Sequence, residues 1–381
     1  MTSSSNSPTI ERPPNAIGAL RLLFASLVIV SHSPEMLDGG PGREPLYRFL
    51  HTLTFGGLAV DAFFLISGYL ITASFVSSAN VGAYFMKRVL RIYPAFVVCS
   101  LLCVLLVAPL GGASLAHLGL GGWTRLTYRL AMLKSPEVAG AFSGLPYATL
   151  NGSAWTISYE FRCYILAALL GIAGLYARPR VYVVLTAAVL AASVALGWSS
   201  TATMQVPGWV EAIFGDPLQS ARLLSAFMVG ACFWLYRRSL PLKGLYAAVA
   251  AVALGGLAFS PHFAEPALVL LGGYILFWVS FKVRWKPLLT INARDDISYG
   301  TYLYAWPIGI VLIWYWRAIP APALTLLTLA GALALGAISW FVVERPALKW
   351  KPRSWPGRER AGTPIKIAPQ DSPTEGVSQQ A

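Results

Sequence analysis

Two ionisable side chains lie within one apolar stretch near the N-terminus, RLLFASLVIVSH, which runs from Arg21 to His32. A charged group at mid-bilayer costs about 2.5–3.5 kcal/mol on insertion scales, so it normally faces a protein interior or a cavity. Eleven helical positions make about 20° more than three full turns and roughly 16 Å of rise, which places both groups on one face. That face offers a cation and, about half a hydrocarbon thickness away, a possible acid or base.

Two carboxylates lie at a similar depth within predicted apolar spans. Asp61 lies in GGLAVDAFFLISGYLI and Glu160 in NGSAWTISYEFRCYIL, each about five residues, or roughly 7 Å, into its span, near the level expected for His32. We expect Asp61 either to hold one ring nitrogen of His32 protonated, so that the other accepts a proton, or to be an interfacial carboxylate. Glu160 needs a partner other than Arg162, which points away from it on a straight helix.

Three further charges gather at the other end of the predicted spans. Arg88 and Arg91 in YFMKRVLRIYPAF are three residues apart and share a helix face. They are either topological anchors or a polyphosphate site, since each guanidinium can bind phosphate oxygens bidentately. Glu344 in VVERPALKW ends the last span on the same side and is expected to pair with these arginines or with Arg21.

Aromatic residues flank the predicted site. Trp155 marks the outer interface, and Tyr159 follows it by one helical turn. Tyr302 and Tyr304 lie inside the span that contains ISYGTYLYAWPI, where aromatic packing is the alternative to a role in lining the acceptor site.

No metal site is predicted. Cys99 and Cys103 are four residues apart, but no histidine or carboxylate accompanies them, so we expect these thiols to pack in the core.

The composition predicts an all-α integral membrane protein. Of the 381 residues, 56% are hydrophobic and 12% are charged, about half the charged fraction of soluble domains. Ten apolar spans are expected, at about 16–35, 56–76, 89–110, 155–176, 181–198, 221–236, 242–259, 267–281, 297–316 and 322–343. The long segment 111–154 between the third and fourth spans is expected to be a lid or a half-buried re-entrant segment.

The distribution of lysine and arginine predicts the orientation. With a cytoplasmic N-terminus, 20 of these residues lie inside and 7 outside, so both termini are expected in the cytoplasm. The net charge of +13 reflects this bias, and no nucleic-acid partner is expected. The transmembrane domain would span 16–346, between an N-terminal tail at 1–15 and a basic, then disordered tail at 347–381.

Taken together, these segments resemble acyltransferase family 3, whose members O-acylate envelope and exported glycans. The likeness covers about residues 14–350. It rests on the Arg21–His32 spacing and on the motifs AVDAFFLISGYLI, KRVLRIYPAF, NGSAWTISYE, ISYGTYLYAWP and VVERP in that order. Many relatives have a histidine within a motif similar to YLYHWP. This chain has YLYAWP there, with Ala305 at the position of the histidine.

The resemblance implies a catalytic role for Arg21 and His32, a donor-binding role for Arg88 and Arg91, and an essential acidic position at Glu344. It implies an acyltransferase (EC 2.3.1.-) of the bacterial inner membrane, with no bound cofactor. The co-substrate would be acyl-CoA, with acetyl-CoA expected. The acceptor would be a carbohydrate or a lipid-linked glycan such as lipopolysaccharide or exopolysaccharide.

A proton-coupled transporter is the alternative. Buried arginine, histidine and carboxylates within ten spans would suit such a carrier. The sequence has neither the internal repeat nor the paired broken helices that many transporters show. We therefore favour the acyltransferase.

Overall fold

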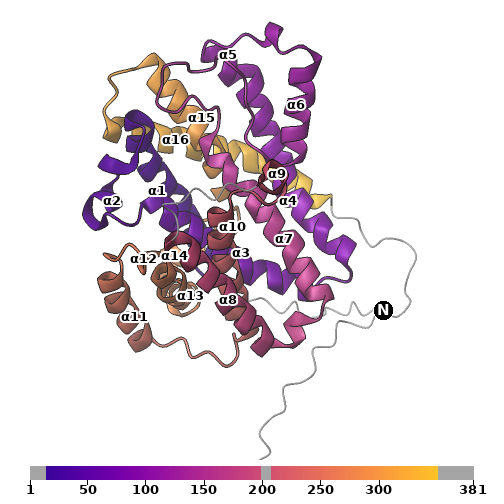
Figure 1. The fold of residues 1–381 in the computed structure, drawn as a ribbon, viewed down its shortest axis with the longest axis vertical. Helices are drawn as coiled ribbons and strands as arrows, with labels where there is room; N and C mark the ends of the chain where they lie inside the picture. Colours follow the sequence, from indigo (N-terminus) through magenta and orange to yellow (C-terminus); the bar gives the residue numbers. More distant parts are fainter. Residues whose placement is uncertain (1–13, 199–206, 351–381) are drawn as a thin grey trace, which may run out of the picture.

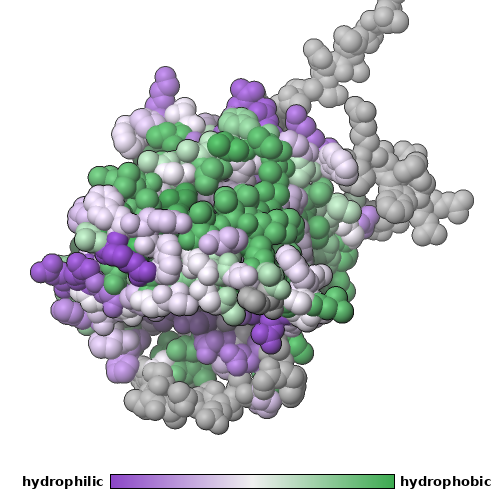
Figure 2. All heavy atoms as spheres, turned by 90° about the horizontal axis from the view of Figure 1, so that it is seen from above, coloured by the Kyte–Doolittle hydropathy of each residue, from purple (hydrophilic) through white to green (hydrophobic). Residues whose placement is uncertain are grey.

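The computed structural model describes residues 14–198 and 207–350, and within these ranges every regular element is helical (Figure 1). The all-α class predicted from the sequence is thereby confirmed. The predicted tails at 1–15 and 347–381 lie largely outside the described residues. Figure 2 shows a broad hydrophobic area across one face, with hydrophilic residues gathered toward its edges.

Seven helical runs among the described residues are long and apolar enough to cross a membrane. The chain is therefore a multi-pass membrane protein. The runs are Ile17–Asp38 (α1), Phe55–Val76 (α3), Val81–Leu110, Pro179–Gly197 (within α8, Pro179–Trp198), Pro217–Leu235 (α10), Ala264–Lys282 and Ala321–Lys349.

The other three predicted spans coincide with helices that are shorter or more polar. These are α7 (Trp155–Ile172), α11 (Gly244–Leu257) and α15 (Ser298–Tyr315). Shorter helices connect the long ones: α2 (Pro45–Leu50), α6 (Gly119–Ala131), α9 (Gly208–Phe214) and α14 (Lys286–Thr290).

Three of the long runs contain a π-helical turn. Cys103–Val107 joins α4 (Val81–Leu102) to α5 (Ala108–Leu110), and Leu268–Gly272 joins α12 (Ala264–Ala267) to α13 (Gly273–Lys282). The third, Trp340–Glu344, joins α16 (Ala321–Ser339) to α17 (Arg345–Lys349). Such turns are frequent at functional sites, and the third ends on Glu344.

Glycines allow the central helices to approach closely. A Cβ at Gly68 of α3 would lie 1.9 Å from the carbonyl oxygen of Phe227, and one at Gly230 of α10 would lie 2.0 Å from that of Leu65. Helices α15 and α16 approach in the same way at Gly300. Small residues at these crossings bring backbones together where lipid supplies no hydrophobic force between helices.

The segment 111–154 folds along the surface. Its main element, α6, carries exposed apolar side chains, with Leu120 86% exposed and Trp123 43% exposed. An amphipathic helix of this kind is typical of a membrane interface. Helix α6 and α11 lie at opposite sides of the bundle (Figure 1).

Candidate functional site

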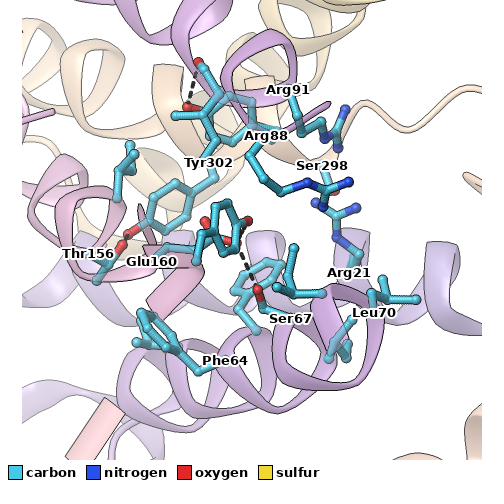
Figure 3. A pocket seen from close by; sticks show the side chains of 18 residues that line it. Arg21, Phe64, Ser67, Leu70, Arg88, Arg91, Thr156, Glu160, Ser298 and Tyr302 are labelled. Atoms are coloured by element: carbon cyan, nitrogen blue, oxygen red, sulfur yellow. Dashed lines mark hydrogen bonds between the residues drawn. The ribbon is translucent and has the colours of Figure 1, made fainter. Parts of the chain in front are cut away.

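A pocket lies among α1, α3, α4, α7 and α15 (Figure 3). Its empty volume is about 860 Å³, which includes space open to solvent. Figure 3 shows the guanidinium groups of Arg21, Arg88 and Arg91 together at one side, with Thr156 and Glu160 across from them. Arg21 therefore lines the same pocket as Arg88 and Arg91, the pair considered as a polyphosphate site.

Two of these arginines share a carboxylate. Arg21 and Arg91 both donate to Oδ2 of Asp296, with 2.6 Å between Arg91 Nη2 and that oxygen. Arg91 Nη1 also lies 3.3 Å from Oε2 of the buried Glu344, and Ser339 Oγ donates to Oε1 of Glu344 at 3.1 Å. The predicted pairing of Glu344 with an arginine is confirmed, while the direct partner of Arg21 is Asp296.

Asp296 precedes α15, and sequence reasoning missed it. Asn292 Nδ2 donates to its Oδ1 at 3.0 Å, and Ser298 Oγ also donates to this oxygen. Burial by itself would raise the pKa of this carboxyl group, but Arg21, Arg91 and these hydrogen bonds lower it below its usual range. Asp296 is therefore a permanent anion that holds two guanidinium groups in place.

Arg88 differs from the other two arginines. It has no carboxylate partner among the described residues: Nη2 donates to Ser74 Oγ at 3.3 Å, and the group lies 5.8 Å from the ring centroid of Tyr164. Its buried Nε has no hydrogen-bond partner in the part of the chain that the structure describes. Arg88 thus has donors free for an anionic ligand in the pocket.

The opposite end of the pocket is mostly apolar. Val60, Phe63 and Ile157 line it together with one carboxylate, Glu160. The partners of Glu160 are hydroxyl groups, since Ser67 Oγ donates to its Oε1 at 3.2 Å and Tyr164 donates as well. The pocket therefore combines a cationic side with an apolar end that contains one polar group.

His32 lines a separate, smaller cavity. The cavity is lined by Ile29, His32, Ser33, Met36, Ser153, Ala305, Trp306 and Thr328. His32 Nδ1 lies 2.8 Å from Oε2 of Glu35, three residues along the same helix, and the His32 ring packs edge-on against Trp306 at 5.2 Å. With Nδ1 hydrogen-bonded to a carboxylate, Nε2 is the nitrogen left to accept a proton.

The prediction that Asp61 orients His32 is therefore wrong. Asp61 is completely buried beside Arg222 of α10, with Oδ2 3.1 Å from Arg222 Nη2, and Arg222 also pairs with Glu265. Arg222 lies in the second turn of α10, within the helix and not in a loop. A buried carboxylate needs a cation within reach, and the nearest one belongs to another helix.

The predicted grouping of Glu160 with His32 is also wrong, because a wall separates the two hollows. Tyr302 lines the larger pocket, and its hydroxyl group lies 2.7 Å from Thr156 Oγ1 and donates to the carbonyl oxygen of Ser153. Ser153 is itself part of the lining around His32. One layer of side chains thus divides the pocket that contains Glu160 from the cavity that contains His32.

Three aromatic residues predicted to line the acceptor site lie outside both hollows. Trp155 and Tyr159 pack against each other at 5.4 Å, and the Tyr159 hydroxyl group accepts a hydrogen bond from the Asp216 backbone. Tyr304 is buried in the core. Of the four predicted aromatic residues, only Tyr302 lines the pocket.

An open groove lies between α6 and the segment 137–150. Arg125 projects from α6 along this groove and has no polar partner among the residues that the structure describes. At the inner end, the carbonyl oxygen of Thr149 accepts a hydrogen bond from Trp306 Nε1 at 2.9 Å. Because Trp306 also packs against His32, the groove ends beside the histidine cavity.

The geometry suits transfer of a group between two ligands. Three guanidinium groups can bind a phosphorylated compound at one side of the pocket. The carboxylate-bound imidazole can act as a general base or as a nucleophile. No group of histidine, cysteine and carboxylate side chains suited to a metal ion occurs within residues 14–198 and 207–350.

Comparisons with known proteins agree with this chemistry. A family model described as an acyltransferase domain matches residues 15–343. An O-acetyl transferase of Shigella phage Sf6 is 30% identical over 341 residues, which cover 87% of this chain and 95% of the phage protein.

Two other relatives cover most of both chains. Nodulation protein 10 of Rhizobium leguminosarum bv. viciae is 27% identical over 88% of this chain and 93% of its own length. The putative membrane-bound transacylase BcsY of Komagataeibacter xylinus is 26% identical over 82% of each chain. No solved structure shows significant similarity.

Proposed function

Since this chain belongs to acyltransferase family 3, we propose that it moves an acetyl group from acetyl-CoA to a hydroxyl group of an envelope or exported carbohydrate. The observation that carries the proposal is the pocket with Arg21, Arg88 and Arg91 at one end and an apolar lining at the other. Coenzyme A has the same polarity, with phosphates at one end and a thin, uncharged pantetheine arm at the other.

His32 would supply the base. With Nδ1 hydrogen-bonded to Glu35, Nε2 takes the proton of the acceptor hydroxyl as its oxygen attacks the thioester carbonyl carbon. The carbon–sulfur bond then breaks, and the proton passes to the leaving thiolate. A second route has Nε2 attack the thioester first to give an acyl-imidazole, which the hydroxyl group then cleaves. Both routes need the thioester to pass the Tyr302–Thr156 contact.

The groove beside α6 is our candidate for the acceptor path. It ends at Thr149, whose carbonyl oxygen holds the indole of Trp306 against the ring of His32. A sugar hydroxyl at this end would approach His32 from the side opposite to the arginine pocket. The names of the relatives, which include an O-acetyl transferase and a nodulation protein, support an acyl acceptor of this general kind.

We further propose ten spans, with both termini in the cytoplasm of a bacterial inner membrane. The seven long apolar runs would be joined by α7, α11 and α15. This orientation rests on the excess of lysine and arginine on one side, and it places the arginine pocket where cytoplasmic acyl-CoA is available.

Reconstitution into liposomes tests the proposal. We expect the purified protein to release CoA from acetyl-CoA and to label an added polysaccharide, with no net solute flux. A proton-coupled carrier would instead move solute without releasing CoA. Acetyl-CoA can be supplied only outside or only inside the liposomes. The arrangement in which CoA is released would show on which side of the membrane the donor site lies.

Arg88→Gln should weaken donor binding and leave the chemical step nearly unchanged. A hydrogen bond to a charged group contributes about 1.5–3 kcal/mol, so the KM for acetyl-CoA should rise about 10- to 100-fold while kcat stays within a few-fold. The measurement is initial-rate CoA release over a range of acetyl-CoA concentrations.

The adjacent Lys87 provides a matched control, because it is a neighbouring cation that does not line the pocket. Lys87→Gln should keep the wild-type KM for acetyl-CoA. Equal values of KM for the two variants would show that Arg88 is a topological anchor.

Arg125→Gln should act on the acceptor only. If Arg125 binds an anionic group on the carbohydrate, its removal should raise the acceptor KM about 10-fold or more and leave the KM for acetyl-CoA unchanged. Kinetics with acidic and neutral polysaccharides as alternative acceptors measure this effect. Arg48, an exposed cation of α2, provides the control, and an unchanged acceptor KM for Arg125→Gln would remove the groove from the acceptor path.

A further inference from the structure

Two buried hydroxyl groups in the His32 cavity have no hydrogen-bond partner. Ser153 is 1% exposed and Thr328 is 4% exposed, and both line the cavity. Neither Ser153 Oγ nor Thr328 Oγ1 bonds to any residue that the structure describes. An unsatisfied buried hydroxyl group costs about 1–3 kcal/mol, so a pair of them beside one histidine calls for a functional explanation.

The two hydroxyl groups come from distant parts of the chain. Ser153 lies in the short 3-10 turn Gly152–Ala154 before α7, and Thr328 lies within α16. The turn is held firmly, because the carbonyl oxygen of Ser153 accepts from Tyr302 and that of Asn151 accepts from Ser135 Oγ at 2.6 Å. The Ser153 hydroxyl is therefore fixed in place without being used for a hydrogen bond of its own.

Other hydroxyl groups close to these two do find partners. Thr325, three residues before Thr328 on α16, donates to the carbonyl oxygen of Ala321 at 2.9 Å. Ser33, which also lines the cavity, donates to the carbonyl oxygen of Ile29 at 2.8 Å. Serine and threonine in helices commonly use this bond to the preceding turn. Thr328 lacks such a bond, and its donor stays available.

From this juxtaposition we propose that the hydroxyl groups of Ser153 and Thr328 bind the carbonyl oxygen of the acyl group while it reacts at His32. This inference rests on the proposed acetyl transfer and assigns the acyl subsite of that reaction. Apart from His32 and Ser33, whose hydroxyl group bonds within α1, the rest of the lining is Ile29, Met36, Ala305 and Trp306. The empty volume, about 220 Å³ including open space, leaves room for a carbonyl oxygen but not for a long acyl chain.

The step follows from the chemistry of thioesters. As the nucleophile adds to the carbonyl carbon, the C=O π electrons move onto oxygen, and the two O–H groups donate to that developing negative charge. When the intermediate collapses, the C=O bond re-forms and the carbon–sulfur electrons leave with the thiolate. His32 carries the proton between the acceptor oxygen and the sulfur.

Thr328→Val separates this role from a structural one. Valine keeps the shape and removes only the hydroxyl group. Loss of one oxyanion donor typically costs about 10²–10³ in kcat, so we expect a fall of that size with little change in the KM for acetyl-CoA. Because the variant removes an unsatisfied buried group, its thermal unfolding temperature in detergent should equal or exceed that of the wild type.

Three further variants complete the test. Thr325→Val, on the same helix, should keep wild-type turnover. Thr328→Ser should recover most of the activity because it restores a hydroxyl group, and Ser153→Ala should show a loss like that of Thr328→Val. The assay is CoA release from acetyl-CoA, with water or added polysaccharide as the acceptor.

The outcomes are distinguishable. Turnover of Thr328→Val and Ser153→Ala within a few-fold of Thr325→Val would overturn the acyl subsite while leaving the proposed function intact. A wild-type protein that releases no CoA would overturn the proposed function itself. Loss of turnover in Thr328→Val together with a lowered unfolding temperature and no rescue by Thr328→Ser would show a packing role and would also overturn the subsite.

Discussion

His32→Ala is expected to lower acyl transfer by about 10²–10⁴-fold, the usual contribution of a positioned general base, and by more if His32 also carries the acyl group. The protein should still insert and fold, because the His32 side chain is 24% exposed at a small cavity and Glu35 keeps its hydrogen bond from Ser31 Oγ when the imidazole is lost. Rates of CoA release in liposomes measure the effect.

Glu35→Gln is the companion variant. It keeps a hydrogen-bond acceptor near Nδ1 of His32 but removes the negative charge that would stabilise the imidazolium form. Turnover should fall less than in His32→Ala, and Glu35→Asp should recover part of it. Residual activity of His32→Ala within a few-fold of the wild type would remove His32 from the mechanism.

Asp296→Asn should have the second large effect. Asparagine leaves Arg21 and Arg91 facing each other without the anion that both contact, and this partly buried cluster loses up to the about 3–5 kcal/mol that breaking a fully buried pair costs. We expect a lower unfolding temperature and at least a 100-fold loss in kcat/KM for acetyl-CoA.

Glu344→Gln provides the comparison for Asp296→Asn. Glu344 contacts Arg91 alone among these arginines, at 3.3 Å, and its Oε1 can still accept from Ser339 after the substitution. Turnover should fall strongly while the unfolding temperature falls less than in Asp296→Asn, and Glu344→Asp should recover part of the turnover. Wild-type behaviour of Asp296→Asn would show that the guanidinium groups find other partners.

The pH dependence of Asp296 follows from its lowered pKa. A carboxyl group whose pKa is lowered by folding adds stability above its unfolded pKa, and this stability is lost only as the pH falls through the lower, folded value. The difference in unfolding temperature between the wild type and Asp296→Asn should therefore stay constant between pH 8 and pH 5. A difference that shrinks across this interval would contradict the assignment.

The sequence predicted the long helices well because hydrophobic length and helical periodicity are local properties. The predicted span 56–76 is Phe55–Val76 in the structure, and 297–316 is Ser298–Tyr315. The same local reasoning placed Arg88 and Arg91 on one face, and both line the pocket. The boundary was less accurate at the start of the third span, which was predicted at 89 although α4 begins at Val81.

The partners of the charged residues were harder to predict, because they depend on packing between helices. Depth alone grouped Asp61 and Glu160 with His32, yet depth does not specify which helix face meets which neighbour. Asp296 lies in a short loop with no periodicity, so nothing local relates it to Arg21, 275 residues away in sequence. Glu35 could have been found, since residues three apart on a helix are neighbours.

The wall formed by Tyr302, Thr156 and Ser153 has a consequence for the energy supply of the cell. Under the proposed orientation, the arginine pocket opens to the cytoplasm and the His32 cavity lies toward the outside, so an open path between them would also conduct protons. Each charge that crosses a potential of 100 mV dissipates about 2.3 kcal/mol. In the structure this path is closed by the Tyr302 hydroxyl, which bonds to Thr156 and Ser153. An enzyme that transfers acyl groups across a membrane can thus avoid a proton leak between turnovers.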